Sequence, residues 1–288
     1  MSESLPKERD LWQYNRAVSV QLAAVLAALQ RLAPLQFAEP WDNVGLIVEP
    51  TPVAQAAPLD SALLTIDLSD EVVEEAERLG ATLVVAYHPP IFSGLKRLRS
   101  SEPSERAVLR CATQGITVFS PHTALDAAPD GVNAWLLEAF GAGQRGPCVA
   151  NAVDARYGQG RFVRLEAEIT LADAVDRIKR HLMLPQLRVA AAARHETSTA
   201  SIRSVAVCAG AGGSVFEKLS GYDLYLTGEM RHHDVRARAS SGSSVVLAEH
   251  THTERGFLPV LAQRLRAEVG DAVTFHASQC DREPLSLR

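Results

Sequence analysis

The chain has 288 residues, 47% of them hydrophobic and 22% charged, a balance typical of a globular protein with one large or two ordinary domains. Its formal net charge of −5 and isoelectric point near 6.0 give no basic footprint, which argues against nucleic acid as a partner. The four cysteines are far apart and form no C-x-x-C motif, which indicates reduced thiols in a cytoplasmic protein. Residues 1–15 are polar and are expected to be frayed, and no apolar run of about 18 residues predicts a membrane segment.

Strand and helix patterns alternate through the first half of the chain. Residues 21–32 repeat apolar side chains at helical spacing, and a turn containing Trp41 then leads into a short strand that ends at Val48. We expect Trp41 to be a core residue of this turn. Strands are then predicted at 63–66, 82–86 and 116–119, and helices at 72–79, 103–113 and 130–140. This β-α-β order predicts a largely parallel sheet with helices on its faces.

The second half opens with a segment rich in glycine, residues 141–160, which is the best candidate for a domain boundary. Strands are predicted after it at 162–169, 205–208, 222–226, 245–248 and 273–275, and helices at 171–183, 214–219 and 256–269. The glycine-rich turn at 209–214 is either a tight turn or a cradle for an anion at a helix start. It lacks the register of a dinucleotide motif and the lysine of a P-loop, which favours the tight turn.

Six of the nine histidines follow predicted strands, in four clusters. These are His88, His122, His232, His233, His250 and His252. Acidic residues accompany three of the clusters, namely Asp126, Glu229 and Glu254. Open α/β sheets bind ligands beyond the carboxyl ends of their strands, and histidine with carboxylate suits Zn, Mn, Fe, Co or Ni. The pattern therefore predicts a metal site, and two ions about 3.5–4 Å apart would activate water for hydrolysis.

Other roles remain open for some of these histidines. His122 is equally well explained as a helix cap or as a residue that supports a ligand, and His232 and His233 as the start of a surface helix. A serine or cysteine nucleophile is not supported, because there is no G-x-S-x-G motif and no cysteine beside a histidine at a strand end.

Five ordered motifs carry a resemblance to a known family. They are W-D-N-V-G-L at 41–46, Y-H-P-P-I-F at 87–92, H-T-A-L-D-A-A at 122–128, T-G-E with two histidines at 227–233, and His250 with Thr253 and Glu254. With these motifs the chain resembles the NIF-three-like family of dinuclear-metal-centre proteins, often named GTP cyclohydrolase 1 type 2 homologues. The resemblance implies two interlinked α/β domains with mainly parallel sheets flanked by helices, a ring-shaped homohexamer, and a two-metal site that faces a central cavity.

The resemblance also implies the metal ligands. Carried over by position, they are His88, Asp126, His250 and Glu254. Many members of the family have two adjacent histidines where this chain has Tyr87 and His88. Either Tyr87 is a phenolic ligand, or His122 or His252 replaces the missing histidine, or one of the two divalent ions is weakly held. Glu229, His232 and His233 are possible further ligands or pocket residues.

The expected domains are residues 16–127 with 250–288, which carry the metal ligands, and residues 128–249. The expected function is that of a metal-dependent hydrolase of a nucleotide or a related heterocycle. Two alternatives remain: a regulatory protein that binds a transcription-related protein partner, and a metal-handling protein. No membrane partner is expected.

Overall fold

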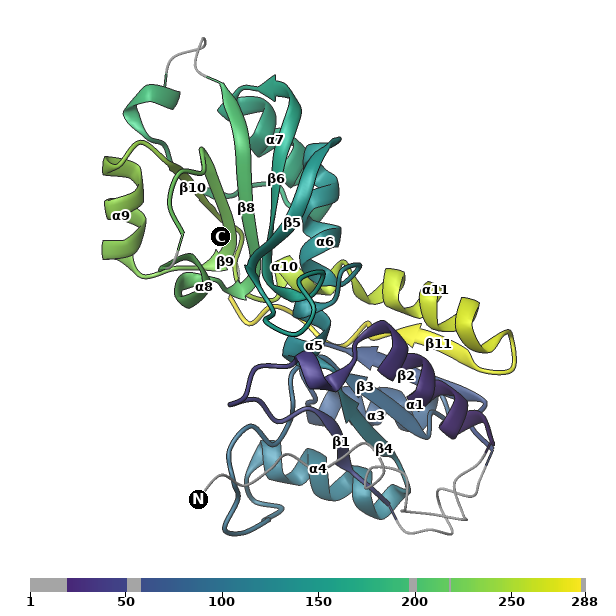
Figure 1. The fold of residues 1–288 in the computed structure, drawn as a ribbon. Helices are drawn as coiled ribbons and strands as arrows, with labels where there is room; N and C mark the ends of the chain where they lie inside the picture. Colours follow the sequence, from purple (N-terminus) through teal and green to yellow (C-terminus); the bar gives the residue numbers. More distant parts are fainter. Residues whose placement is uncertain (1–19, 51–57, 197–200, 218, 286–288) are drawn as a thin grey trace, which may run out of the picture.

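The computed structural model describes residues 20–50, 58–196, 201–217 and 219–285, so the segment expected to be frayed lies outside the described residues. The chain forms two lobes, each built on one sheet (Figure 1). The first lobe holds a five-stranded sheet of order β1-β4-β3-β2-β11, and the second lobe a six-stranded sheet of order β5-β6-β8-β9-β10-β7. The predicted α/β class, with two sheets flanked by helices, is confirmed.

The sheet of the first lobe is parallel except at one edge. Its strands are β1 (Gly45–Val48), β4 (Thr117–Ser120), β3 (Leu83–Ala86), β2 (Ser61–Thr65) and β11 (Thr274–Ala277). Only β1 runs antiparallel to its neighbour, and β2, β3 and β4 are buried along their whole length. Strands covered on both faces read as continuous apolar runs, which is why their sequences show no alternation.

Two pairs of helices cover this sheet. One face packs against α3 (Asp70–Arg78) and α4 (Pro103–Gln114), and the other against α1 (Val20–Leu32) and α11 (Leu258–Val269). Local signals fix the ends of these helices. The Ser69 side chain accepts a hydrogen bond from Val72 N at the start of α3, and Gly115 ends α4 in the left-handed conformation at φ 77°.

The sheet of the second lobe is mixed rather than mainly parallel. Its strands are β5 (Gly143–Ala150), β6 (Gly158–Ile169), β8 (Ile202–Ala211), β9 (Leu224–Glu229), β10 (Ser244–Leu247) and β7 (Arg188–Ala190). The strands β8, β9 and β10 are parallel, whereas β5, β6 and β7 each join antiparallel. The short connection between β5 and β6 allows only an antiparallel pair, because a parallel pair needs a long crossover.

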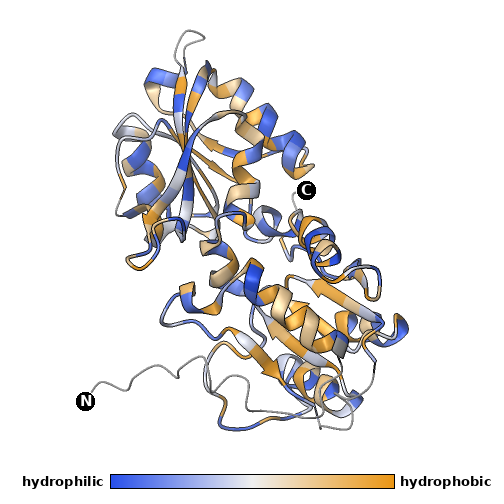
Figure 2. Cartoon of the chain, turned by 45° about the vertical axis from the view of Figure 1, so that its right-hand side comes forward, coloured by the Kyte–Doolittle hydropathy of each residue, from blue (hydrophilic) through white to orange (hydrophobic). Residues whose placement is uncertain are grey.

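The helices of the second lobe lie on opposite faces of its sheet. Two of them, α6 (Val132–Leu137) and α7 (Leu171–Leu182), pack on the face that presents Val205 and Val207. The other face packs against α8 (Gly213–Glu217) and α9 (His232–Ser240). Colouring by hydropathy shows the apolar residues gathered on the strands and the inward faces of the helices (Figure 2). No helix in the described ranges has the length and hydrophobicity that a membrane crossing requires.

The glycine-rich segment 141–160 is not a boundary loop, since most of it forms β5 and the start of β6. Its glycines permit close strand pairing. A Cβ at Gly143 would come within 2.2 Å of the Arg164 carbonyl oxygen, and one at Gly146 within 2.9 Å of the Phe162 ring. The sequence suggested a domain boundary here because glycine is common in connections, whereas in this segment it allows another backbone to approach.

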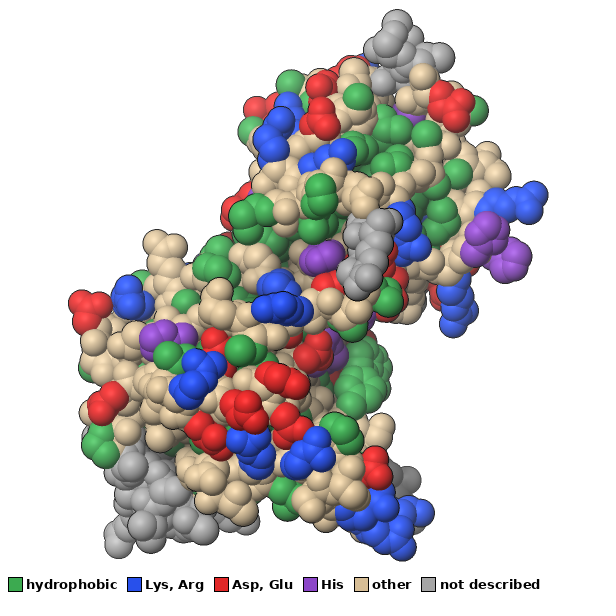
Figure 3. Space-filling model, turned by 180° about the vertical axis from the view of Figure 1, so that it is seen from behind, with side chains coloured by type: hydrophobic (Ala, Val, Ile, Leu, Met, Phe, Trp, Pro, Cys, Tyr) green, Lys and Arg blue, Asp and Glu red, His purple; other side chains and the backbone are tan. Residues whose placement is uncertain are grey.

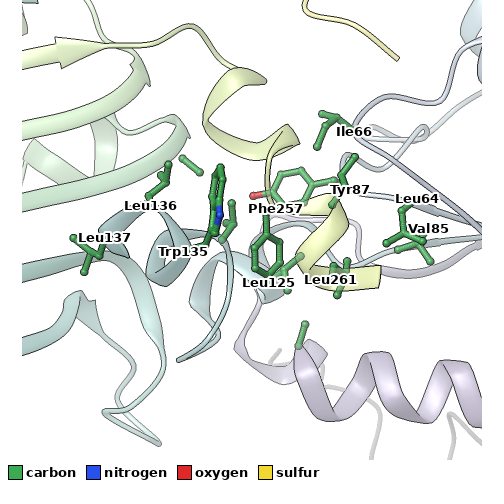
Figure 4. Close-up of a cluster of buried hydrophobic side chains, with 14 of the residues drawn as sticks. Leu64, Ile66, Val85, Tyr87, Leu125, Trp135, Leu136, Leu137, Phe257 and Leu261 are labelled. Carbon is green, nitrogen blue, oxygen red and sulfur yellow. The ribbon is translucent and has the colours of Figure 1, made fainter. Parts of the chain in front are cut away.

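A single hydrophobic core joins the two lobes. Tyr87 follows β3, Trp135 lies on α6 and Phe257 precedes α11, and all three belong to one buried cluster that reaches both sheets (Figure 4). Gly256 lies against Trp135, where a Cβ would come within 2.6 Å of the indole ring. The helix predicted at 256–269 is α11, which begins at Leu258, and the short helix α10 (His252–Arg255) comes before it. The division into residues 16–127 with 250–288 and residues 128–249 remains a proposal.

Candidate metal centre

Three of the predicted ligands meet where the lobes join. His88 follows β3, His250 follows β10, and Glu254 lies on α10. One ligand atom of each lies within 4.8 Å of the others. Glu254 Oε1 is 3.4 Å from His250 Nε2, and Glu254 Oε2 is 3.5 Å from His88 Nε2. The strand ends of two different sheets thus bring two imidazoles to one carboxylate.

The Glu254 carboxylate has the surroundings of a metal ligand. It is 3% exposed, and its Oε2 atom accepts no hydrogen bond. A buried carboxylate oxygen without a partner is costly, and a cation would satisfy it. Around a tetrahedral ion with bonds of about 2.1 Å, ligand atoms lie about 3.4 Å apart, close to the two separations seen here. The residues therefore fit a divalent ion of the type that histidine and carboxylate bind.

A carboxylate orients each of the three imidazoles in this region. The Nδ1 atoms lie 2.9 Å from Asp67 Oδ1 in His88, 2.8 Å from Glu229 Oε1 in His250, and 2.8 Å from Asp42 Oδ1 in His122. Because a carboxylate can only accept, Nδ1 donates in each pair and Nε2 is the atom left for a ligand. This carboxylate–imidazole arrangement is the usual support of metal-binding histidines.

The site concentrates negative charge around His88. Burial disfavours the protonated imidazole, but the hydrogen bond to Asp67 and the nearby Glu254 carboxylate outweigh burial and raise the pKa of His88 to about 10. Burial also disfavours the charged form of Asp67, yet the hydrogen bond from His88 leaves the pKa of Asp67 below its usual value. The pocket therefore stabilises positive charge at the place where the ligand atoms converge.

Tyr87 and Asp126 form a buried pair beside this cluster. The Tyr87 hydroxyl donates to Asp126 Oδ1, and Tyr87 is only 3% exposed. Burial, together with the charges of Asp126 and Glu254, raises the pKa of Tyr87 well above 10.0, so its hydroxyl keeps its proton. Burial raises the pKa of Asp126 to about 6, against the opposing effects of His122 and the Tyr87 hydroxyl. The Tyr87 hydroxyl thus holds the Asp126 carboxylate in position beside the cluster.

His122 approaches the same cluster from α5 (His122–Ala127). Its ring centroid lies 5.3 Å from that of His88 and 5.7 Å from that of Tyr87. Its φ of 24° is one of three positive values at non-glycine residues within the described ranges, and a second is at Glu249, next to His250. Strained backbone of this kind tends to gather at functional sites, where the surrounding structure holds it in place.

These side chains line a cavity of about 530 Å³ to which both lobes contribute. His88, His122 and Asp126 come from the first lobe and its junction, and Gln159 and Ser214 from the second. Seen from behind, histidine, acidic and hydrophobic side chains lie together at the waist between the lobes (Figure 3). The volume lies in the range of small-molecule sites.

The remaining predicted residues lie outside this cavity or behind a ligand. Glu229 is exposed and pairs with His250, and His232 and His233 are exposed in the first turn of α9. His252 turns back along the chain, with its Nδ1 atom 3.1 Å from the Ala248 carbonyl oxygen. None of these four is among the described residues that line the cavity.

Sequence reasoning missed Asp42 and Asp67 as supporting residues. Asp67 directly follows the strand predicted at 63–66, so the rule that selected the histidines could have selected it. Asp42 belongs to the W-D-N motif, but it was not given a role. The structure also corrects Trp41, which was expected in the core and is 60% exposed.

Gly210 closes the cavity behind the ligands. It has a φ of 59°, and a Cβ there would come within 2.6 Å of Glu254 Oε1 and 2.8 Å of His250 Nε2. Its N–H donates to Thr253 Oγ1 at 2.8 Å, which ties β8 to α10. Residues 209–211 thus end β8, and Gly212 alone connects this strand to α8, which has only five residues, so the connection is tight.

Comparison with known proteins gives concordant matches. The family model described as DUF34/NIF3 (NGG1p interacting factor 3) matches residues 20–284. NIF3-like protein 1 of Rattus norvegicus is 34% identical over 93% of either chain, and NGG1-interacting factor 3 of Saccharomyces cerevisiae is 36% identical over 95% of this chain and 99% of the yeast protein. Among solved structures, hypothetical protein SA1388 of Staphylococcus aureus superposes with a TM-score of 0.79 at 22% identity, covering 94% of this chain and 100% of that one. Reduced HcgD from Methanocaldococcus jannaschii gives 0.72 at 20% identity, covering 89% and 97%.

Proposed function

The chain belongs to the DUF34/NIF3 family, and on that basis we propose that it is a metal-dependent hydrolase of a nucleotide or a related heterocycle, with two divalent ions at the lobe junction. One observation carries the proposal: the buried Glu254 carboxylate faces two imidazole nitrogens, and one of its oxygens accepts no hydrogen bond. Bound divalent ions supply Lewis acidity and activate water near neutral pH.

The residues of this chain divide into holders and supports. His88, His250 and Glu254 hold one ion, and Asp126 with His122 completes the second position in place of the histidine that Tyr87 replaces. Asp67, Glu229 and Asp42 fix the imidazoles, and Tyr87 fixes Asp126. Zn, Mn, Fe, Co and Ni all suit these ligands.

The test compares His250→Ala with Glu254→Ala, as a double variant, with the wild-type protein. We expect wild-type protein to contain about two ions per chain and to turn over a phosphorylated nucleotide in a metabolite screen. The double variant should lose both the metal and the turnover. His232→Ala with His233→Ala is the matched control, since these exposed histidines lie outside the cavity. Equal activity in the first double variant and the wild type would refute the hydrolase.

A second candidate function is that of a regulatory protein with a protein partner. The name of the yeast relative, NGG1-interacting factor 3, favours it, because it describes contact with another protein. In that case the double variant His250→Ala with Glu254→Ala still retains the protein partner in a pull-down, and neither this variant nor the wild-type protein shows turnover. A metal-handling role instead predicts rapid ion exchange and preference for one metal in competition dialysis.

We also propose that the chain forms a homohexamer and is cytoplasmic. Light scattering on purified protein, at a mass near six times 31.1 kDa, tests the assembly, and cell fractionation tests the location.

A further inference from the structure

Two aromatic side chains stand exposed at the edge of the proposed metal centre. Trp41 is 60% exposed and Phe92 is 56% exposed, and both line the same cavity as His88 and Glu254. Their ring centroids lie 5.9 Å apart, and each lies against His122, at 6.2 and 6.3 Å. Large apolar rings left in water at a polar site are a recurrent sign of ligand binding.

The backbone under these two rings is held in place. The Asn43 side-chain amide donates to the Ile91 carbonyl oxygen at 2.6 Å, which joins the segment carrying Trp41 to the segment carrying Phe92. The Asp42 carboxylate accepts from Thr123 N at 3.1 Å, which fixes the first segment to α5. The pair is therefore a built platform on two connected segments, and we call Trp41 and Phe92 the aromatic platform.

The geometry of the aromatic platform selects how a ligand can lie on it. The two rings are tilted by 49° and already contact each other, so no third ring fits between them. A flat ligand must instead lie over the platform, with the apolar side chains of Val149 and Val215 from the second lobe also lining the space. Ser214 and Gln159 add a hydroxyl and an amide for the polar edge of such a ligand.

Charge in the cavity favours recognition of a ring over recognition of a phosphate. The described residues that line the cavity include Glu39, Asp126 and Glu254 but no lysine or arginine. Phosphate binding by a protein chain usually relies on such cations or on a helix N-terminus. The described side chains of this pocket thus offer an anion no lysine or arginine, whereas Trp41 and Phe92 offer a flat ring an aromatic surface.

We propose that the aromatic platform binds a planar heteroaromatic ring of the nucleobase class, stacked on Trp41 and Phe92 with one edge toward His88 and Glu254. The orientation of that edge rests on the proposed function, since it places the ring beside the metal ligands. The stacking itself does not depend on turnover. Trp41 and Phe92 are thus the residues that select an aromatic substrate for this site.

The test uses probes that share sugar and phosphate but differ in the ring. GMP, AMP, CMP and UMP are each titrated into the metal-loaded full chain by calorimetry, and ribose 5-phosphate is the probe without a ring. We expect at least one nucleotide to bind at least about 5-fold more tightly than ribose 5-phosphate, because stacking on an aromatic side chain contributes by this factor or more. Trp41→Ala and Phe92→Ala should each weaken that nucleotide by about 5- to 150-fold, and Trp41→Phe should retain most of the affinity.

The matched control is Leu98→Ala, since Leu98 is 48% exposed and does not line the cavity. It should leave binding unchanged, and all variants should keep the wild-type metal content. The proposal is overturned if no nucleotide binds more tightly than ribose 5-phosphate, if Trp41→Ala binds like the wild type, or if Trp41→Ala changes the mass in light scattering, which would make the platform a subunit contact. Tight ring binding without any turnover would refute the hydrolase and leave the platform standing. If Trp41→Ala turns over substrate as the wild type does, the hydrolase stands and the aromatic platform is refuted.

Discussion

Gly210→Ala should damage the metal centre without removing a single ligand atom. The added Cβ would lie 2.6 Å from Glu254 Oε1 and 2.8 Å from His250 Nε2, at a residue whose φ is 59°. Ordinary contact begins at 3.4 Å, so the carboxylate oxygen has to move by about 0.8 Å. Metal–ligand distances tolerate only about 0.2 Å, so this shift is several times what the site can absorb.

The cost divides between stability and metal affinity. The left-handed backbone costs alanine about 1–2 kcal/mol, and overpacking in a buried site typically adds about 1–3 kcal/mol. If the ligands yield to the new methyl group, the second part appears as lost affinity. We expect a loss of about 10- to 100-fold, the range seen when the supports of metal ligands are changed.

Gly213→Ala is the matched control, because Gly213 begins α8 three residues after Gly210 and a Cβ there meets nothing within 4 Å. Metal content by mass spectrometry, metal affinity by chelator competition and stability by urea unfolding are measured for both variants. Gly210→Ala should fold and lose metal, whereas Gly213→Ala should retain it. A folded Gly210→Ala protein with wild-type metal affinity would show that the ion does not lie between His250 and Glu254.

Two further predictions concern carboxylates that hold the site and the fold. Asp67→Asn keeps an acceptor for His88 Nδ1 but removes its charge, so the pKa of His88 should fall from about 10, as read by NMR, and metal affinity should drop about 10- to 100-fold. Asp271→Asn, at a carboxylate with a 94% exposed side chain, is its control, and equal affinities in the two variants would contradict the support role. Glu75 accepts hydrogen bonds from Ser278 Oγ and Gln279 N, and these outweigh burial and hold the pKa of Glu75 below 4.5 in the folded protein. The ionised carboxylate therefore contributes its full share to the free energy of unfolding above pH 4.5. This contribution is lost as the pH falls through the lower pKa of the folded state. Glu75→Gln should therefore cost about 1–3 kcal/mol in urea unfolding at pH 7 and much less near pH 3, and a cost that does not change with pH would refute this assignment.

Much of the fold could be read from the sequence because the local signals and the tertiary structure agree. The strands of the first lobe are short apolar runs between capped helices, and both patterns survive in the structure. The strand 143–150 was not predicted because its glycines make room for the neighbouring strand β6, and this neighbour cannot be seen in the sequence of the segment itself. The strand β6 was predicted, but the antiparallel pairing of β5, β6 and β7 was not, because the partner of a strand is not a local property of its sequence.

The site shows the same limit at the level of single residues. His88 and His250 could be found because each follows a predicted strand, and Glu254 because it lies four residues after His250. The sequence did not show that the two strands belong to different sheets, which meet at the lobe junction. Trp41 was misplaced because a tryptophan in an apolar sequence is usually buried, and only the structure places it beside Phe92 in solvent. The role of Gly210 arises because the β8 backbone passes so close to Glu254 that there is no room for a methyl group between them. No spacing of residues along the chain predicts this contact.

Tyr87 shows why the metal centre and the packing of the lobes depend on each other. Its ring belongs to the core that joins both sheets, while its hydroxyl donates to Asp126 in the cavity. A histidine at this position would add a ligand but would give up part of that core, because an imidazole is smaller and more polar than a phenol. We propose that His122, whose Nδ1 is held by Asp42, takes the ligand role of that histidine. A change in the junction core around Trp135 and Phe257 should therefore also reach the proposed metal centre, because Tyr87 belongs to that core and its hydroxyl contacts Asp126.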